Sequence, residues 1–281
     1  DALICDLLRL EVPVADMSEW QEIIRKLIAP QHRVRIGVVG KYIDLNDAYK
    51  SVYEAIIHGG VAQDCGVAIE KIDAEDIDPA HPEATLQGLA GILVPGGFGE
   101  RGIEGKIAAA RYARENNIPY FGLCLGMQIA TIEFARHVMQ LDQAHSVEFD
   151  PQTPHPVIWL MEAQKDVADK GGTMRLGAQI CHIKPNTLAA RLYGKDQVSE
   201  RHRHRFEFNS QYRESFEAAG LIVSGSTEDN DLVEMVEIKN HRFYIACQFH
   251  PEFQSKPNQP HPLFKGFIGA CMQETGSQNT Q

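Results

Sequence analysis

The sequence lacks the features that mark a secreted or membrane-embedded protein. Its six cysteines lie at positions 5, 65, 124, 181, 247 and 271, without the paired spacings of a disulfide framework. It has no uninterrupted apolar run of about 18 residues, and no basic segment ahead of an apolar one, so neither a membrane span nor a signal peptide is predicted. We therefore expect a protein of the reducing cytoplasm with no membrane partner.

Positive charge is also scarce. The chain carries 27 lysines and arginines against 38 aspartates and glutamates, a net charge of −11, whereas a nucleic-acid-binding surface needs a broad basic patch. The one dense basic run, Arg201 to Arg205, alternates arginine with histidine. Because no Cys-x-x-Cys pair accompanies it, we do not predict a zinc site and interpret it as an anion-binding or subunit-contacting strand. No nucleic-acid partner and no metal are expected.

The common glycine-rich nucleotide-binding motifs are missing. Gly40-Lys41-Tyr42 follows the first apolar run, where G-x-G-x-x-G would be needed. The sequence around Lys106 departs from a phosphate loop, because Glu100 stands in a glycine position and Ile107 follows the lysine. Neither dinucleotide nor ATP binding is predicted for this chain.

What the sequence does contain is a cysteine between an apolar strand and a helix, in the stretch Pro119 to Gln128. Gly122 and Gly126 flank Cys124 in the spacing G-x-C-x-G, the thiol counterpart of the G-x-S-x-G nucleophile elbow. At a helix N-terminus the backbone N–H groups and the helix dipole stabilise a thiolate. Cys124 is therefore the candidate nucleophile, and a small hydrophobic residue of the core is the alternative.

A candidate base lies near the other end of the chain, between Phe243 and Glu252. The apolar residues before His250 predict a buried strand that Pro251 ends, which places the histidine at the edge where open parallel sheets bind ligands. Glu252 can accept the other imidazole N–H and fix the tautomer. A solvated loop is the alternative for each residue alone, but together with an elbow cysteine they predict acyl transfer.

A glycine-rich loop follows a third apolar run, between Gly91 and Gly102. Such a loop can turn backbone N–H groups toward a tetrahedral oxyanion. One N–H from Gly97 and one from Leu125, the residue after the cysteine, would complete the oxyanion hole.

These three motifs, in this order, resemble the class I (triad) glutamine amidotransferases, and the resemblance runs from about Asp1 to Met272. In that family a cysteine attacks the side-chain amide of glutamine, a histidine protonates the departing ammonia, and water releases glutamate from a thioester. The resemblance implies that Cys124 is the nucleophile, His250 the base and Glu252 its orienter.

The resemblance also implies the residues that bind L-glutamine. Gln128 and Glu148 would hold its amino group or backbone, and Arg205 would meet its carboxylate, for which a planar guanidinium is well suited. The segment from Phe98 to Gly105 resembles the family's mobile lid, in which Arg101 is linked to activation by GTP. The predicted glutamine-binding set is Gly97, Leu125, Gly126, Met127, Gln128, Glu148 and Arg205.

Further segments narrow the resemblance to family members with a second, N-terminal domain. They are 37–42, 47–51, 171–177 and 200–209. In those members an amidoligase domain binds UTP, ATP and magnesium and aminates UTP, GTP is the activator, and the assembly is a homotetramer. The chain opens on Asp1 rather than methionine, so the resemblance implies an excised C-terminal half that supplies ammonia to that domain and needs no cofactor of its own.

The alternation of strands and helices predicts an α/β fold, doubly wound, with a mostly parallel, flavodoxin-like central sheet covered on both faces and an antiparallel extension. Residues 1–33 are interpreted as interdomain linker helices, 34–273 as the amidotransferase domain and 274–281 as a disordered tail. Strands are predicted at 34–39, 67–72, 90–94, 119–123 and 243–249, with an extension at 157–160, 175–183, 204–208, 221–225 and 232–238; helices are predicted at 3–10, 17–28, 47–62, 102–115, 125–137 and 262–273.

Two other functions stay open. A free-standing glutaminase or γ-glutamyl hydrolase of the same fold would need no partner, so kinetics with glutamine alone would identify it. A regulatory or filament-forming module with a vestigial pocket is the non-enzymatic alternative, against which the presence of Cys124, His250 and Glu252 weighs. Labelling by a glutamine-analogue electrophile would decide between this module and an enzyme.

Overall fold

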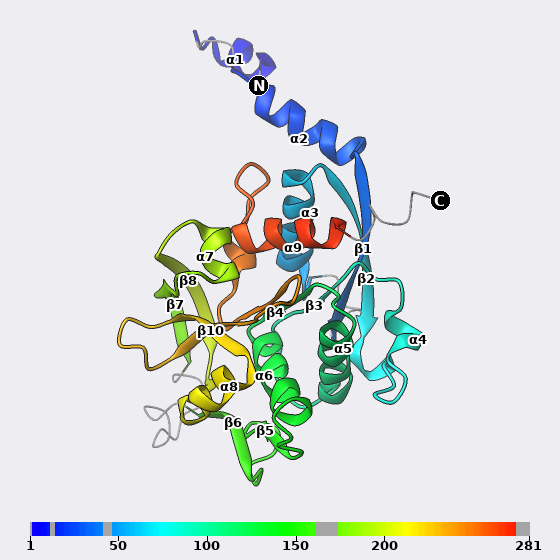
Figure 1. The fold of residues 1–281 in the computed structure, drawn as a ribbon. Helices are drawn as coiled ribbons and strands as arrows, with labels where there is room; N and C mark the ends of the chain where they lie inside the picture. Colours follow the sequence, from blue (N-terminus) through cyan, green and yellow to red (C-terminus); the bar gives the residue numbers. More distant parts are fainter. Residues whose placement is uncertain (1, 12–14, 42–46, 161–173, 274–281) are drawn as a thin grey trace.

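The computed structural model describes residues 2–11, 15–41, 47–160 and 174–273. Its centre is a nine-stranded sheet in the order β2-β1-β3-β4-β12-β11-β10-β7-β8 (Figure 1). The strands are β1 (His32–Gly40), β2 (Cys65–Asp73), β3 (Gly91–Val94), β4 (Tyr120–Leu123), β7 (Arg175–Ile183), β8 (Gln197–His204), β10 (Leu221–Ser226), β11 (Val233–Ile238) and β12 (Tyr244–Cys247).

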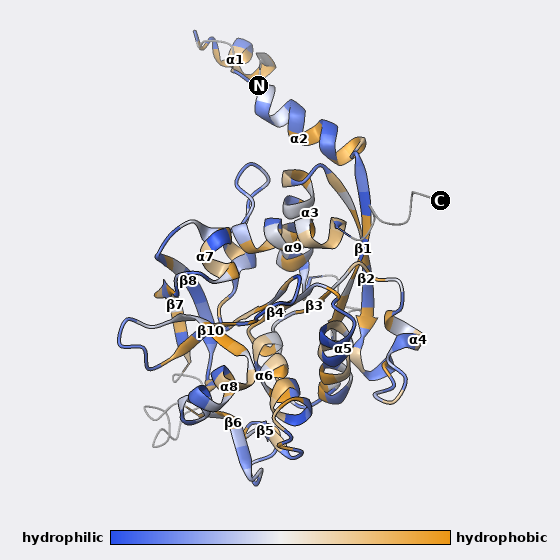
Figure 2. Cartoon of the chain, in the orientation of Figure 1, coloured by the Kyte–Doolittle hydropathy of each residue, from blue (hydrophilic) through white to orange (hydrophobic). Residues whose placement is uncertain are grey.

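The parallel half of the sheet carries helices on both faces (Figure 1). The helices α3 (Lys50–Ala62) and α9 (Pro262–Met272) pack together on one face, and α5 (Ile103–Glu115) and α6 (Leu125–His137) pack together on the other. Strands β3, β4 and β12 are buried along their whole length, which explains their continuous apolar runs (Figure 2). Two apolar cores therefore form, one under each helical layer.

The predicted fold class is confirmed, but the antiparallel extension is larger than expected. Four of the eight strand pairings are antiparallel, those that run from β12 through β11, β10 and β7 to β8. A separate small sheet is formed by β5 (Ala144–Ser146), β6 (His155–Leu160) and β9 (Phe206–Phe208). The helices α7 (Leu188–Tyr193) and α8 (Arg213–Ala219) complete this part of the fold, whereas α4 (Glu83–Leu86) lies beside α5 in the parallel half (Figure 1).

One predicted strand is wrong in a way that matters for the site. The segment predicted as a single strand at 204–208 divides between two sheets, because β8 ends at His204 and β9 begins at Phe206. Arg205 therefore lies at the corner between them. The alternation of histidine and arginine in the sequence agrees with the alternating burial of β8, but alternation does not reveal where a strand leaves one sheet for another.

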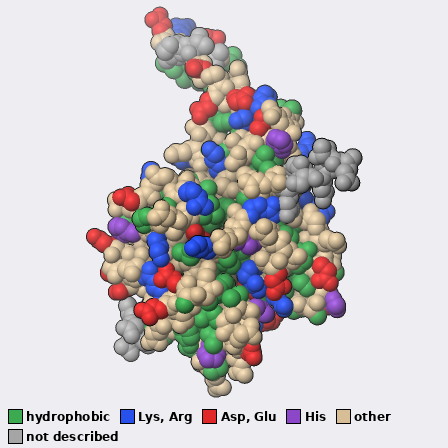
Figure 3. Space-filling model, in the orientation of Figure 1, with side chains coloured by type: hydrophobic (Ala, Val, Ile, Leu, Met, Phe, Trp, Pro, Cys, Tyr) green, Lys and Arg blue, Asp and Glu red, His purple; other side chains and the backbone are tan. Residues whose placement is uncertain are grey.

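Two helices precede the sheet and extend away from it, α1 (Ala2–Leu8) and α2 (Ser18–Ile28) (Figures 1 and 3). The start of the sheet holds α2 through an ion pair between Arg25 and Asp64, with 2.7 Å between nitrogen and oxygen. Many large apolar side chains of this pair of helices are exposed, among them Leu3, Leu7, Trp20, Ile24 and Ile28. Within the described ranges, no helix is both long and apolar enough to cross a membrane.

Candidate active site

Cys124 forms a strained turn between β4 and α6. Its φ of 51° and ψ of −99° place a non-glycine residue at positive φ, a conformation that costs energy and that clusters at functional sites. The backbone N–H of Cys124 donates to the Cys247 carbonyl at 2.7 Å, which ties the turn to β12. The side chain is thus lifted to the carboxyl edge of the sheet, at the N-terminus of α6.

The two glycines of the G-x-C-x-G motif are required by close backbone packing. A Cβ on Gly126 would lie 2.1 Å from the Val94 carbonyl oxygen, and one on Gly122 would lie 2.6 Å from the Gly126 carbonyl oxygen. The Tyr120 hydroxyl donates to that same Gly126 carbonyl at 2.9 Å. The spacing in the sequence therefore reflects how tightly the first turn of α6 is pressed against β3 and β4.

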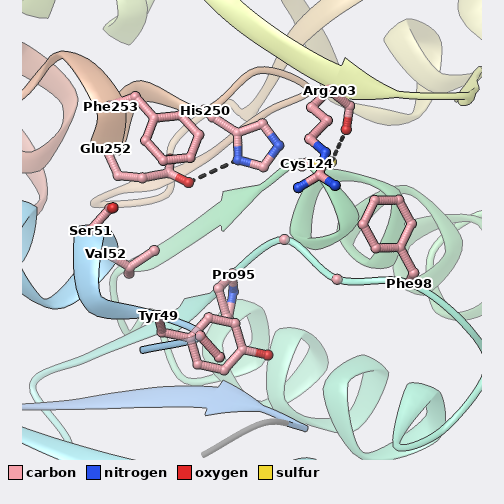
Figure 4. Close-up of a pocket in the computed structure, with 13 residues that line it drawn as sticks. Tyr49, Ser51, Val52, Pro95, Phe98, Cys124, Arg203, His250, Glu252 and Phe253 are labelled. Carbon is pink, nitrogen blue, oxygen red and sulfur yellow. Dashed lines mark hydrogen bonds and ion pairs between the residues drawn. The ribbon is translucent and has the colours of Figure 1, made fainter. Parts of the chain in front are cut away.

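His250 lies three residues beyond the end of β12 and is held from two sides. Its Nδ1 lies 2.8 Å from Oε1 of Glu252 (Figure 4), and its backbone N–H donates to the Arg201 carbonyl at 2.8 Å. A Cβ built on Gly96 would lie 2.9 Å from the His250 ring and 3.5 Å from the Cys124 Cβ. The structure therefore brings Cys124, His250 and Glu252 together around the glycine-rich loop.

The charges of these groups are coupled. Burial alone lowers the pKa of His250. The neighbouring Cys124 and the Glu252 carboxylate raise it by more than burial lowers it, so the pKa is about 11. Among the described residues, Nε2 of His250 has no hydrogen-bond partner. The imidazole can therefore stand as a cation beside Cys124.

A pocket opens beside Cys124 and collects most of the predicted glutamine-binding residues. Gly97, Leu125, Gln128, Glu148 and Arg205 all line it, and the remaining lining residues are Phe98, Met174, His204 and Phe206. Two predicted members lie elsewhere: Gly126 and Met127 do not line the pocket, and the Met127 side chain is fully buried.

The family model of the class I glutamine amidotransferases matches residues 44–270 of this chain. The chain belongs to that family. Among curated relatives, the CTP synthase of Chloroflexus aurantiacus is 55% identical over 267 residues, which are 94% of this chain and 49% of the relative. The CTP synthase of Aquifex aeolicus is 52% identical over 273 residues, 97% of this chain and 51% of the relative. The chain thus spans about half the length of the curated relatives it matches.

A solved structure agrees with this assignment. The Trypanosoma brucei CTPS glutaminase domain with bound acivicin superposes with a TM-score of 0.80 at 41% identity, and the match covers 85% of this chain and 94% of that one. This amidotransferase therefore corresponds to the glutamine amidotransferase half of CTP synthases.

In this amidotransferase, the polar groups of the pocket already have partners. Gln128 donates from Nε2 to the Phe206 carbonyl at 3.0 Å. The Glu148 carboxylate accepts the backbone N–H of Gly99 at 3.2 Å. Burial raises the pKa of Glu148, and the Gly99 hydrogen bond and the Arg205 charge act in the opposite direction. Anionic and cationic groups thus face one small cavity, which suits a zwitterionic ligand.

A second pocket lies on the histidine side of Cys124 (Figure 4). Gly97, Phe98 and Cys124 line both pockets, so the thiol stands between them. The Arg203 carbonyl lies 3.9 Å from Sγ, and the Arg203 guanidinium lies 5.8 Å from the centre of the Phe98 ring. Other residues that line this second pocket are Tyr49, Val52, Pro95, His250, Glu252 and Phe253.

The loop between β3 and α5 holds residues 98–102 of the predicted lid, whose last three residues begin α5, and three cationic side chains hold this loop in place. Arg101 donates to the Lys41 carbonyl at 2.6 Å and lies 3.3 Å from Glu75, whereas Lys41 donates to the Phe98 carbonyl. Lys106, which is buried, donates to the carbonyls of Arg101 and Gly102. Arg101 lines neither pocket beside Cys124.

Sequence reasoning missed Gln248, which touches the thiol directly. Its Nε2 lies 3.7 Å from Cys124 Sγ, and its side chain is fully buried. The available signal was a polar residue inside the apolar run from Phe243 to Phe249. No cluster of three or more His, Cys, Asp or Glu side chains suited to a metal ion occurs in the described part of the chain.

Proposed function

We propose that this chain is the glutaminase part of a CTP synthase and hydrolyses L-glutamine to glutamate and ammonia through a thioester on Cys124. The observation that carries the proposal is a strained cysteine beside His250, at the edge of a pocket lined by Glu148 and Arg205. The pKa of His250 is raised to about 11. Nucleophile, base, base-orienting carboxylate and substrate-binding charges then all occur in one place.

In the proposed reaction, the Cys124 thiolate attacks the side-chain amide carbon of glutamine. The carbonyl oxygen becomes an oxyanion that accepts hydrogen bonds from the backbone N–H groups of Gly97 and Leu125. As the intermediate collapses, the C–N bond breaks and His250 gives its proton to the departing ammonia. Water, deprotonated by His250, then cleaves the thioester and restores the thiolate. Glu252 keeps the imidazole oriented through both steps.

The substrate's own charges account for the remaining groups of the pocket. The α-amino group would bind Glu148, in place of the Gly99 N–H that occupies this carboxylate in the structure. The α-carboxylate would bind Arg205, and Gln128 would contact the substrate backbone. Phe98, which lines both pockets, would cover the bound amino acid as part of a lid, and Arg101 would link this lid to activation by GTP.

The activity of the longer protein is part of the same proposal. The relatives that are twice as long are CTP synthases, so we propose an N-terminal amidoligase domain in the same polypeptide. It would use ATP and magnesium to aminate UTP, with GTP as activator, in a cytoplasmic homotetramer. Residues 1–33 would be the linker to that domain, and 34–273 the glutaminase domain.

The test is covalent labelling followed by a rate measurement. The chain is incubated with 6-diazo-5-oxo-L-norleucine, a glutamine analogue with an electrophilic carbon, and digested for mass spectrometry. We expect one adduct, on the peptide that contains Cys124, and no adduct and no glutamate release with Cys124→Ser. An adduct elsewhere, or glutamate release that persists in Cys124→Ser, would contradict the proposal. A rate with glutamine that neither GTP nor an added amidoligase domain changes would favour a free-standing glutaminase.

A further inference from the structure

The His-Arg alternation of β8 has an inner face that the proposed reaction does not use. His202 and His204 point into the protein and are buried, with 3% and 2% of their surface exposed. The arginines that alternate with them face outward, where the Arg201 guanidinium lies over Phe253 and that of Arg203 over Phe98. The inner histidines therefore need an explanation of their own.

His204 closes the corner at which β8 gives way to β9. Its Nε2 lies 2.7 Å from Oε1 of Glu207, three residues further on, and both side chains are buried. Arg205 and Phe206 lie between these two partners and line the pocket beside Cys124. The contact thus joins His204 and Glu207 inside the protein, whereas Arg205, which lies between them in the sequence, lines the pocket.

The corner is connected to two further strands by buried charges. Arg175 on β7 lies 3.7 Å from Glu207 and 2.5 Å from Glu234 of β11. Nε2 of His202 lies 3.3 Å from the second oxygen of Glu234. A continuous chain of buried polar groups therefore runs from His202 through Glu234, Arg175 and Glu207 to His204.

This chain of buried polar groups is not explained by a gain in folding stability alone. Buried ion pairs lose solvation, and replacing them with apolar residues is often neutral or stabilising. Several of its atoms have no hydrogen-bond partner among the described residues, which adds a further cost. They are Nδ1 and Nε2 of His202, Nδ1 of His204, Oε2 of Glu207 and Oε2 of Glu234. We infer that these buried polar groups fix the geometry of the corner between β8 and β9.

We propose that this buried chain of polar groups is a positioning device that aims the Arg205 guanidinium and thereby sets selectivity for a substrate with a free α-carboxylate. The inference rests on the proposed glutaminase function. Glu207 is its central positioning residue, because it contacts both His204 at the corner and Arg175 on the neighbouring strand. A substrate without the carboxylate makes no use of Arg205, so its reaction does not depend on this device.

The test compares two substrates, L-glutamine and L-glutamine α-amide, whose α-carboxylate is replaced by a neutral amide. With Glu207→Gln we expect kcat/KM for L-glutamine to fall about tenfold, mainly through KM, because a charge-assisted hydrogen bond is lost or misaligned. For the α-amide we expect a change of less than about twofold. Glu133→Gln is the matched control, since Glu133 is also a buried carboxylate, 2.8 Å from Arg114, and lines neither pocket beside Cys124.

The outcomes separate the inference from the function on which it rests. An unchanged ratio of kcat/KM for L-glutamine to kcat/KM for the α-amide, whether both values fall equally or neither falls, would overturn the inference alone. If Glu207→Gln does not fold, Glu234→Gln removes an ionisable carboxyl group two contacts away from the corner and should lower the same ratio about threefold. An unchanged ratio in that variant overturns the inference as well. A wild-type chain that converts neither substrate and takes up no diazo-ketone would overturn the proposed function and the inference together.

Discussion

The side-chain amide of Gln248 donates a hydrogen bond to Cys124 Sγ at 3.7 Å, and its oxygen accepts one from Gln128 at 3.4 Å. Gln248 is fully buried and directly follows β12, the strand that leads to His250. The nucleophile at the end of β4 is thus contacted by the neighbouring strand through a neutral donor as well as by the imidazole. A neutral amide N–H can stabilise a thiolate without transferring a proton to the sulfur.

Replacing Gln248 with methionine keeps the side chain's length and removes the donor. We expect Gln248→Met to lower the rate at which iodoacetamide alkylates Cys124 about tenfold at neutral pH, because a hydrogen bond to a charged group is worth about 1.5 kcal/mol or more. The rate is followed by mass spectrometry of the tryptic peptide. Gln63→Met is the control, since Gln63 donates to the Lys265 carbonyl instead. Equal rates for Gln248→Met and wild type would show that the contact does not stabilise the thiolate.

The packing around Gly96 gives a second prediction. A Cβ at this position would lie 2.9 Å from the His250 ring, closer than unbonded carbon atoms tolerate. Gly96→Ala should therefore displace the imidazole from Cys124 and lower kcat about 10- to 100-fold, as misplacements of about 1 Å do in active sites. KM for glutamine should stay within about threefold, because Glu148 and Arg205 are untouched. A large rise in KM with unchanged kcat would contradict this account.

Much of the site could be predicted because its chemistry lies at sheet edges. The strand ends at Cys124 and His250 follow from local apolar runs that stop at a glycine or a proline, and the carboxyl ends of parallel strands meet at one edge. The bounds of α6 were predicted to the residue, since the elbow fixes where it begins.

The contacts between distant strands could not be predicted in the same way. Alternation placed His202 and His204 on one face of a strand, but it does not show that Glu234 and Arg175 lie opposite them. Those partners depend on the register between β7 and β8 and on the pairing of β11, which no local pattern encodes. Gln248 was missed for a related reason, because a polar residue in an apolar run has no assigned partner until the strands are assembled.

Lys106 gives a prediction about pH. Burial lowers the pKa of this lysine to about 8, with Lys41 and Arg101 adding to the effect and Asp73 and Glu75 opposing it. Its side chain donates to the Arg101 carbonyl at 3.2 Å and to the Gly102 carbonyl at 3.4 Å as a positively charged donor below about pH 8, and as the weaker donor of a neutral amine above it.

We therefore expect kcat/KM of wild type to exceed that of Lys106→Met about fivefold at pH 7, with the ratio falling toward one as the pH rises through 8 to 10. Other titrating groups are common to both proteins and cancel in the ratio. Glutaminase rates measured across this range provide the check. A ratio that stays constant with pH would mean that the charge of Lys106 does not hold the loop.

Glu234 gives the last prediction, which concerns stability. Burial raises its pKa from 4.5 to about 7, while Arg175 acts in the opposite direction and Glu207 adds to the rise. Between these two values the folded protein binds more protons than the unfolded chain, so this group's contribution is fully present below pH 4.5 and is lost as the pH rises through 7. The free energy of unfolding of wild type should therefore fall, relative to Glu234→Gln, by up to about 3 kcal/mol between pH 5 and pH 8. Urea unfolding at several pH values measures this difference, with equal m-values as the control for two-state behaviour. Curves that run parallel across the range would mean that Glu234 is already ionised at pH 5 and that the buried chain of polar groups holds its charge throughout.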